Sequence, residues 1–237
     1  MKKQTIDNII QVNKAFYDKV GVEFSKTRQN QWTGWGSVKK ILENQAKNMS
    51  VINILDIGCG NGRFTEVLNE LHVEYTGIDT DKYLLNEAKS RELPNNYQFI
   101  HGDGILDVFE YIEHYDVIVA FGITHHIPSF ELRQKWFKKV VSILNLNGIF
   151  IFTIWNFPVE KNPHKTHNII DQNDLEEGDY FLGWNNMPDA IRYFHKYSEE
   201  EILTILQNIT TCKLLERFKA DGKSGDLNEY FVLKSVG

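Results

Sequence analysis

The sequence predicts an α/β fold in which helices cover both faces of a mostly parallel sheet and the chain ends in an antiparallel hairpin. The main observation is that strand-like apolar runs alternate with helical segments five times between residues 51 and 155. The second is that residues 212–220 and 226–234 look like two strands joined by the turn DGKSG. Such an antiparallel ending does not fit a sheet built from two successive βαβαβ halves.

Length and composition are consistent with one domain, because 237 residues with 42% hydrophobic content can bury a large core. No apolar run approaches the ~18 residues of a membrane span, and no secretory h-region follows the first lysines, so we expect a cytoplasmic protein without a membrane partner. Two cysteines, Cys59 and Cys212, are too few for a disulfide framework or a zinc site, and we expect no metal.

The charge is unevenly distributed along the chain. Net charge is −6, which argues against a nucleic-acid partner. Residues 1–50, however, hold nine Lys/Arg and four Asp/Glu, a sum of +5, so the remaining residues sum to −11. A basic segment on an acidic body can face a polyanion, and it can equally be a set of solvated lysines.

In chain order, helices are expected from residue 6 to about 20 and at 37–47. The stretch between them, VEFSKTRQNQWTGWG, lacks periodicity, and its Trp32 and Trp35 either form a lid or substrate wall or cover the edge of the core. Strands are expected at 51–57, 73–79, 97–101, 116–121 and 149–155, and helices from 62, from 81, near 105, at 131–144 and at 198–207. Ser198, with Glu201 three residues later, caps the last helix.

The segment ILDIGCGNGRF reads as strand, tight turn and helix, with Asp56 at the strand end and Gly58, Gly60 and Gly62 in the turn. Glycines let the backbone approach a ligand, and a following helix offers free N–H groups. A dinucleotide fingerprint would need a third glycine at Arg63, so that motif fails. The alternative is an ordinary glycine-rich turn between a strand and a helix.

The motif DIGCGNG resembles motif I of the class I S-adenosylmethionine-dependent methyltransferases. That resemblance implies a Rossmann-like sheet of seven strands, with the glycine turn holding the methionine end of the cofactor. Asp79 closes the second strand, where ligands bind in open α/β sheets, and should accept from the ribose hydroxyls; otherwise it caps the next helix. By the same resemblance Asp103 binds the adenine amino group, Gly104 lies against the ring and Phe121 contacts the cofactor, although Asp103-Gly104 also reads as a simple turn.

Further motifs resemble the tRNA wobble-uridine methyltransferases, which methylate the carboxylate of 5-carboxymethyluridine to its methyl ester. They are FSKTR with a nearby Trp, the HH pair, LRQKWFKKVVSILNLNGIFIFTIWN, YFLGW and RYFHKY. The chain departs from the family pattern at Gly183, where a proline is usual, and at Trp155-Asn156. The resemblance implies a tRNA anticodon loop as partner and, as in eukaryotic members, a possible small zinc-binding activator protein.

A carboxylate acceptor is already ionised at neutral pH, so it needs orientation rather than a general base. Bidentate guanidinium groups supply orientation, and Arg28 and Arg192 lie in the motifs above. His125 or His126, after the fourth strand, could add a donor. Each has an alternative role, the arginines in structural ion pairs and one histidine in packing at the sheet edge.

Four segments of a single methyltransferase domain are expected. They are an N-terminal helical or substrate extension at 1–50, a cofactor core at 51–155, a substrate-wall insertion at 156–197, and a helix with the terminal hairpin at 198–237. The insertion holds an acidic run from Asp171 to Asp179 that either faces away from RNA or is a solvated loop. Two other functions stay open: a methyltransferase for small molecules or proteins, and an inactive cofactor-binding partner subunit.

Overall fold

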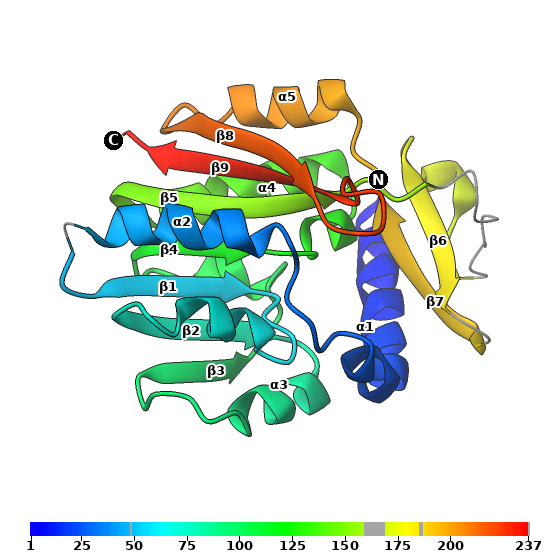
Figure 1. The fold of residues 1–237 in the computed structure, drawn as a ribbon. Helices are drawn as coiled ribbons and strands as arrows, with labels where there is room; N and C mark the ends of the chain where they lie inside the picture. The colour runs from blue at the N-terminus through cyan, green and yellow to red at the C-terminus, as the bar shows by residue number, and fades with distance from the viewer. Residues whose placement is uncertain (48, 159–168, 185–186, 237) are drawn as a thin grey trace.

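The computed structural model describes residues 1–47, 49–158, 169–184 and 187–236. Its centre is a seven-stranded sheet in the order β3-β2-β1-β4-β5-β9-β8, in which β9 and β8 are antiparallel additions to five parallel strands (Figure 1). The strands are β1 (Ile52–Ile57), β2 (Val73–Asp79), β3 (Tyr97–His101), β4 (Tyr115–Ala120), β5 (Leu144–Trp155), β8 (Cys212–Ala220) and β9 (Asn228–Ser235). This confirms the predicted sheet and its terminal hairpin.

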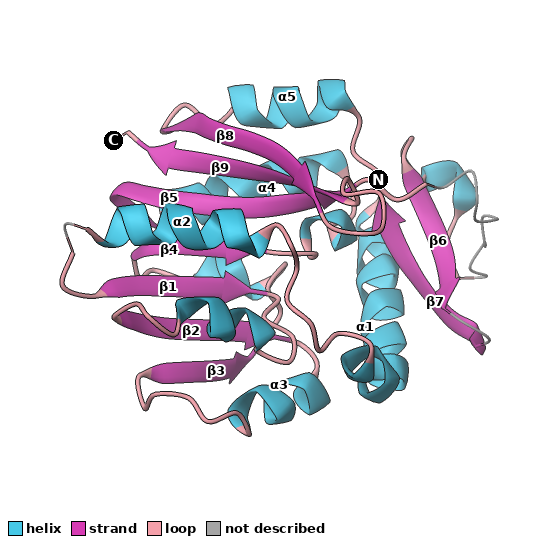
Figure 2. Cartoon of the chain, viewed as in Figure 1, coloured by secondary structure: helices cyan, strands magenta, loops and turns pink. Residues whose placement is uncertain are grey.

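Helices cover both faces of the sheet, as predicted (Figure 2). The α-helices are α1 (Lys3–Lys26), α2 (Trp35–Ala46), α3 (Lys82–Lys89), α4 (Phe130–Ser142) and α5 (Glu199–Gln207). Short 3-10 helices are η1 (Arg63–Leu68), η2 (Asp107–Glu110), η3 (Thr124–His126) and η5 (Gln172–Asp174). Helices α4 and α5 pack on one face, and α2 with η1 packs on the other. Helix α1 instead lies at the carboxyl ends of the parallel strands, where it can reach a ligand (Figure 1).

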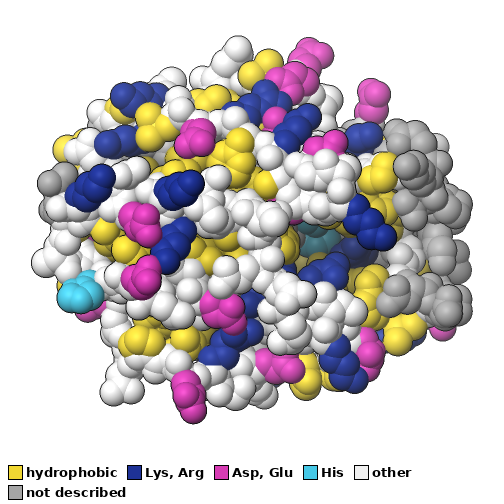
Figure 3. All heavy atoms as spheres, in the orientation of Figure 1, with side chains coloured by type: hydrophobic (Ala, Val, Ile, Leu, Met, Phe, Trp, Pro, Cys, Tyr) yellow, Lys and Arg dark blue, Asp and Glu magenta, His cyan; other side chains and the backbone are white. Residues whose placement is uncertain are grey.

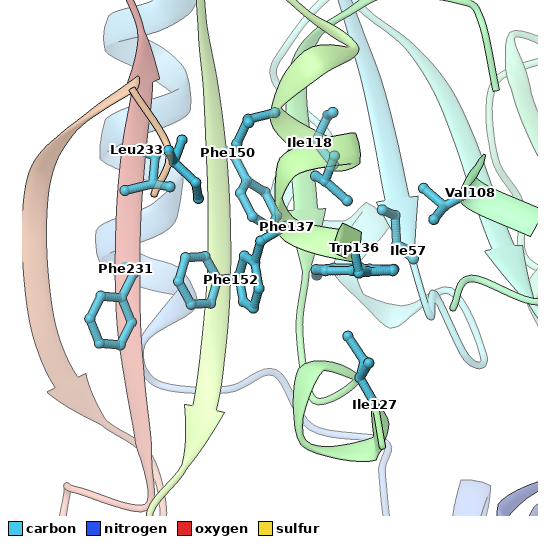
Figure 4. Close-up of a cluster of buried hydrophobic side chains, with 14 of the residues drawn as sticks. Ile57, Val108, Ile118, Ile127, Trp136, Phe137, Phe150, Phe152, Phe231 and Leu233 are labelled. Atoms are coloured by element: carbon cyan, nitrogen blue, oxygen red, sulfur yellow. The ribbon is translucent and has the colours of Figure 1, made fainter. Parts of the chain in front are cut away.

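The larger core cluster lies between α4 and the sheet (Figure 4). Its aromatic side chains include Phe137 of α4, Phe152 of β5 and Phe231 of β9, all fully buried, and the last two rings stack 5.0 Å apart. Trp136 donates its indole N–H to the carbonyl of Gly104 at 2.8 Å. This bond fixes the loop after β3 to the core and so positions one edge of the ligand pocket.

The helix expected from residue 62, after the glycine turn, is a 3-10 helix of 6 residues, Arg63–Leu68. Thr65 explains part of this, because its N–H and its hydroxyl both bond the carbonyl of Gly62 at 3.0 and 2.7 Å. Those bonds favour the tighter i to i−3 pattern over an α-helix. The α-helix N-terminus that the sequence predicts directly after the turn is therefore not formed.

Two further differences concern segments that looked irregular. Helix α1 runs on to Lys26, so the first part of the aperiodic stretch is helical. The insertion forms a separate antiparallel hairpin, β6 (Asp179–Trp184) and β7 (Met187–His195), beside α1. Residues 159–168 and 185–186 of that insertion lie outside the described residues.

The acidic run of the insertion is solvated only in part: Asp171 and Glu177 are exposed, whereas Glu176 and Asp179 have partners in the core. Glu176 binds the buried Arg133 of α4 at 2.8 Å, and Asp179 binds His195 at 2.7 Å. The other ring nitrogen of His195 lies 2.6 Å from Glu201 of α5. Burial lowers the pKa of His195, but hydrogen bonds to the two carboxylates outweigh it and raise that pKa overall. The run thus holds the hairpin to the core.

No helix in the described part of the chain combines the length and apolar character needed to cross a membrane. Within the same residues, His, Cys, Asp and Glu side chains form no group of three or more with the arrangement of a metal site.

Candidate functional site

The glycine turn adopts backbone conformations that side chains disfavour, with φ of 79° at Gly58, 54° at Gly60 and 72° at Gly62. Gly58 and Gly60 line a pocket at the carboxyl ends of β1, β2 and β4. Gly62 does not line it. A Cβ there would lie 2.9 Å from the Cβ of Ala88, so this glycine instead permits close packing of the turn on α3.

Asp79, at the end of β2, also lines the pocket. Its two oxygens accept from the N–H of Gly60 at 2.8 Å and of Asp81 at 2.9 Å. The N-cap of α3 is Asp81, which accepts from Tyr83 and Leu84, so the alternative role considered for Asp79 is taken by its neighbour. The position of Asp79 is consistent with the expected ribose contact.

Asp56 is buried at the end of β1, where its carboxylate accepts a 2.7 Å hydrogen bond from the Tyr75 hydroxyl. Burial raises the pKa of Asp56 to about 7, against the lowering effect of that bond. Burial likewise raises the pKa of Asp79 to about 6. The pocket without ligand therefore carries carboxyl groups that ionise reluctantly near neutral pH.

The pKa of Asp56 leads to a stability prediction. The Asp56 carboxyl group keeps its proton up to about pH 7 in the folded state but releases it near pH 3.8 in the unfolded state. The stability that this difference in pKa contributes to the folded state is therefore fully present below pH 3.8 and is lost as pH rises through about 7. Asp56→Asn removes this loss. We expect the free energy of unfolding of the variant minus that of wild type to increase by on the order of 1–3 kcal/mol from pH 5 to pH 8. Urea unfolding of ligand-free protein at both pH values measures it; a constant difference would contradict the assignment.

The loop after β3 contributes Asp103 and Gly104 to the pocket. One oxygen of Asp103 accepts from the N–H groups of Ile105 at 2.8 Å and Leu106 at 3.1 Å. The turn interpretation is therefore correct for this aspartate, which leaves its other oxygen for a ligand. A Cβ at Gly104 would lie 2.6 Å from a methyl group of Ile57, so only glycine fits there. Phe121, at the end of β4, lines the same pocket.

Helix α1 supplies pocket residues that the sequence analysis did not name as candidates. Asn13, Tyr17 and Ser25 line the pocket. Asn61 of the glycine turn donates to the Ser25 hydroxyl at 3.0 Å and to the Arg28 carbonyl at 3.2 Å, so the end of α1 is tied to the turn. The sequence signal that could have indicated this role is the polar Asn13 at a position of the helix where the spacing calls for an apolar residue.

Trp32 and Trp35 were expected either to form a lid or substrate wall or to cover the edge of the core, and the structure shows both wall and core positions. Trp35 is 3% exposed and belongs to the core beside α2, whereas Trp32 is partly exposed, and both contribute to the pocket wall. Their rings stack 5.4 Å apart, and the guanidinium of Arg63 lies about 5 Å from each ring centroid. Trp32 is thus fixed as wall rather than free to act as a lid.

Arg28 and Arg192 lie close to each other, and the charge of Arg192 adds to burial in lowering the pKa of Arg28. Arg28 lines the pocket. Arg192 does not line it and is nearly buried, with 9% of its surface exposed. The Arg192 guanidinium lies between the rings of Phe16 and Trp155, at 5.3 and 5.0 Å. Among the described residues neither arginine has a carboxylate within ion-pair distance, and Nε of Arg192 has no hydrogen-bond partner. Within the described residues, therefore, neither arginine takes part in a structural ion pair.

The two histidines differ in position. His126 lines the pocket, and its Nε2 lies 2.8 Å from the Tyr17 hydroxyl oxygen. His125 is buried against Trp155, with ring centroids 5.1 Å apart, and does not line the pocket. Burial lowers the pKa of His126 to about 3 and that of His125 well below its usual value, so both are neutral at pH 7. Figure 3 shows a hollow on this face with Lys or Arg side chains at its rim and a histidine inside.

Comparison with known sequences supports a methyltransferase. A profile of the methyltransferase domain matches residues 55–150. The chain is 28% identical over 190 residues to a methyltransferase-like protein of Encephalitozoon cuniculi whose name gives no substrate, covering 80% of this chain and 82% of that one. It is 25% identical over 150 residues to the tRNA (carboxymethyluridine(34)-5-O)-methyltransferase ALKBH8 of Macaca fascicularis, covering 63% of this chain and 21% of that protein. It is 23% identical over 169 residues to the ubiquinone biosynthesis O-methyltransferase of Rickettsia akari, covering 70% of this chain and 62% of that protein.

Solved structures share the fold. An S-adenosylmethionine-dependent methyltransferase from Clostridium acetobutylicum aligns with a TM-score of 0.62 at 19% identity, covering 94% of this chain and 97% of that one. A Burkholderia thailandensis 1,6-didemethyltoxoflavin-N1-methyltransferase with bound S-adenosylhomocysteine aligns with a TM-score of 0.69 at 13% identity, covering 100% and 93%. Residues 55–150 thus match a methyltransferase domain, and the chain has the fold of the S-adenosylmethionine-dependent methyltransferases with a pocket at its glycine turn, which supports S-adenosylmethionine as the cofactor.

Proposed function

We propose that this enzyme methylates the carboxylate of 5-carboxymethyluridine at the wobble position of tRNA, giving the methyl ester. The observation that carries the proposal is a pair of arginines, Arg28 and Arg192, that have no carboxylate partner among the described residues and lie near the neutral His126. Two close cations without counter-ions favour an anionic ligand. One of the sequence relatives is named for this reaction, although the chain spans only about a fifth of its length.

The reaction requires little chemistry from the protein. An ionised carboxylate oxygen attacks the sulfonium methyl group of S-adenosylmethionine, the carbon–sulfur bond breaks, and its electron pair stays on sulfur as S-adenosylhomocysteine. No proton is transferred. Enzyme side chains therefore contribute by placing the oxygen in line with the methyl–sulfur bond, which is the role proposed for the two guanidinium groups.

A phenol acceptor is the competing class, since an O-methyltransferase of ubiquinone biosynthesis is among the relatives. A phenol must lose its proton, which calls for a general base near the methyl group. His126 lines the pocket, but its pKa of about 3 makes it a poor base and its Nε2 lies 2.8 Å from the Tyr17 hydroxyl. The site therefore suits an acceptor that is already ionised.

The acceptor test compares anticodon stem-loops. We expect a loop bearing 5-carboxymethyluridine to be methylated at least about 100-fold faster than the same loop with unmodified uridine, because a pyrimidine C5 carbon needs activation by a nucleophile. Cys59, the one cysteine in the pocket, is buried with a raised pKa. Transfer of labelled methyl groups from S-adenosylmethionine measures both rates. Equal rates, or transfer only to a phenol or a small carboxylate, would exclude the tRNA substrate.

Partners form part of the same proposal. An anticodon loop should bind with a steep loss of affinity between low and physiological salt, because phosphate contacts release counter-ions. A small zinc-binding activator protein is a second candidate partner. Repeating the methylation assay with the chain alone and with such an activator separates an independent enzyme from one that requires a subunit.

A further inference from the structure

His195, at the end of β7, lies between two carboxylates. Its Nδ1 is 2.7 Å from Oδ1 of Asp179, and its Nε2 is 2.6 Å from Oε2 of Glu201. A carboxylate can only accept a hydrogen bond, so both ring nitrogens donate, and a ring that donates from both nitrogens is the cationic imidazolium. The side chain of His195 is 1% exposed, so this positive charge is buried.

A neutral ring would require one of these acids to be protonated, and other donors already bind both. Asp179 also accepts from the Tyr193 hydroxyl at 2.7 Å and from a backbone N–H at 2.8 Å. The other oxygen of Glu201 accepts from Nε of Arg133 at 2.7 Å. Burial raises the pKa of Glu201, but the hydrogen bond from His195 and the charges of His195 and Arg133 outweigh it, so that pKa is lowered overall. Both acids therefore stay ionised.

Titratable side chains face the His195 ring or its partners from four elements and from the loops beside them. We call them the His195 cluster: His195 itself, Asp179 of β6, Tyr193 of β7, Arg133 of α4, Glu201 of α5, Glu176 before β6 and Tyr197 after β7. A neutral His195 would leave Arg133 alone to balance three carboxylates in a largely buried site, which is unfavourable.

Two members of the cluster also hold both ends of η3. The guanidinium of Arg133 donates to the Ile127 carbonyl at 3.1 Å. The Tyr197 hydroxyl donates to the Thr124 carbonyl at 2.9 Å. His126, which lines the pocket, lies between those two carbonyls in the chain. The cluster is therefore attached to the pocket wall through η3 as well as through β7.

We propose that His195 is held as an imidazolium and is a positioning residue for the acceptor, acting through Arg192 and η3. Arg192 lies three residues before His195 in β7, so a shift of the strand end moves its guanidinium as well. The inference rests on the proposed function, in which Arg192 grips an anionic acceptor. Such an acceptor needs no general base, so loss of the His195 proton lowers the transfer rate through geometry alone.

Two replacements separate the charge of the ring from its shape. His195→Gln has no charge, whereas His195→Lys keeps a cation that can donate to both acids. We expect His195→Gln to lower the single-turnover rate of methyl transfer about 10-fold, with the Kd for S-adenosylhomocysteine within about 2-fold of wild type. His195→Lys should be at least about 3-fold faster than His195→Gln, and a lysine variant that binds the cofactor but is no faster overturns the role of the charge.

A matched control is His72→Asn, at an exposed residue, which should transfer methyl groups at the wild-type rate. Should His195→Gln fail to fold, the wild-type protein still tests the charge. In protein labelled with ¹⁵N at histidine and saturated with S-adenosylhomocysteine, both ring nitrogens of His195 should carry protons at about pH 7.5, where an unperturbed histidine has mostly lost one. The His195 signals are those absent from His195→Lys. A ring with a single proton at that pH overturns the proposal.

The pH dependence of transfer follows from the same proton. Burial lowers the pKa of His195, but hydrogen bonds to Asp179 and Glu201 raise it overall, so its contribution to stability is full below about pH 6.5 and is lost as pH rises through the raised pKa. The wild-type rate should fall over the alkaline range in which the second ring proton leaves, and His195→Gln should lack that fall. A wild-type rate that stays constant while the proton leaves overturns the proposal.

Hydrogen exchange followed by mass spectrometry does not depend on the acceptor. In the S-adenosylhomocysteine complex, His195→Gln should lose protection in residues 124–127 and 190–195 but not in β1 and β2. If it does, and carboxymethylated loops are not substrates, the positioning role stands and the proposed acceptor fails. Unchanged protection overturns the positioning role, and so does a loss spread evenly over the chain, since that marks general destabilisation.

Discussion

Replacing Asp79 by alanine should weaken binding of S-adenosylhomocysteine by about 1.5–3 kcal/mol, or roughly 10- to 150-fold. The carboxylate is a charged acceptor in a semi-enclosed pocket, and it also holds the N–H of Gly60 in the glycine turn. Both interactions favour the bound state, because ribose hydroxyls need an acceptor and the turn must keep its shape. Isothermal titration of wild type and variant measures the difference directly.

A matched variant separates the two contributions of Asp79. Asp79→Asn retains a carbonyl oxygen for Gly60 but loses the negative charge, so it should weaken binding less than alanine does. Thermal unfolding of both ligand-free variants serves as the folding control. An alanine variant that is folded and binds the ligand as tightly as wild type would remove Asp79 from the cofactor site.

Arg192→Lys should reduce methyl transfer by at least about 10-fold, equivalent to about 1.4 kcal/mol of transition-state stabilisation, with unchanged cofactor affinity. Lysine keeps the charge but cannot fill the planar space between Phe16 and Trp155 or offer two parallel donors. Arg28→Lys should give a loss of similar size. Single-turnover rates, together with titration of S-adenosylhomocysteine, separate the effect on transfer from any effect on the cofactor.

The two arginines can give different outcomes. Arg28 lines the cofactor pocket, and Asn61 of the glycine turn bonds its carbonyl. If Arg28→Lys loses cofactor affinity in parallel with activity while Arg192→Lys does not, Arg28 belongs to the cofactor and the clamp is Arg192. Normal turnover by both lysine variants would place the carboxylate contacts on other residues.

The cofactor half of the site could be predicted from the sequence because its information is local. Each glycine and acid follows a strand, and parallel strands end at one edge of the sheet, so Gly58, Asp79 and Asp103 had to converge. Gly62 was misleading, since a glycine required for packing on α3 looks the same in sequence as one required for a ligand.

The acceptor half could not be predicted in the same way. Tyr17 contributes to the apolar stripe of α1 and to the pocket at once, and periodicity reveals only the first role. Whether an arginine is paired depends on neighbours that are remote in sequence, which is why the ion-pair alternative for Arg28 and Arg192 stayed open until their surroundings were known. Glu176 and Asp179 of the acidic run likewise looked solvated, because their partners Arg133 and His195 are remote in sequence.

The hydrogen bonds of the two halves span very different lengths of chain. Within the cofactor half, Gly60 bonds Asp79 and Tyr75 bonds Asp56, each pair 19 residues apart. Around Arg192, Tyr17 meets His126 across 109 residues and Asn13 meets Tyr193 across 180. Closing longer loops costs more chain entropy and slows folding. The nucleotide-binding half should therefore mature first during folding, and a refolding chain should regain affinity for S-adenosylhomocysteine before it regains the ability to turn over an acceptor.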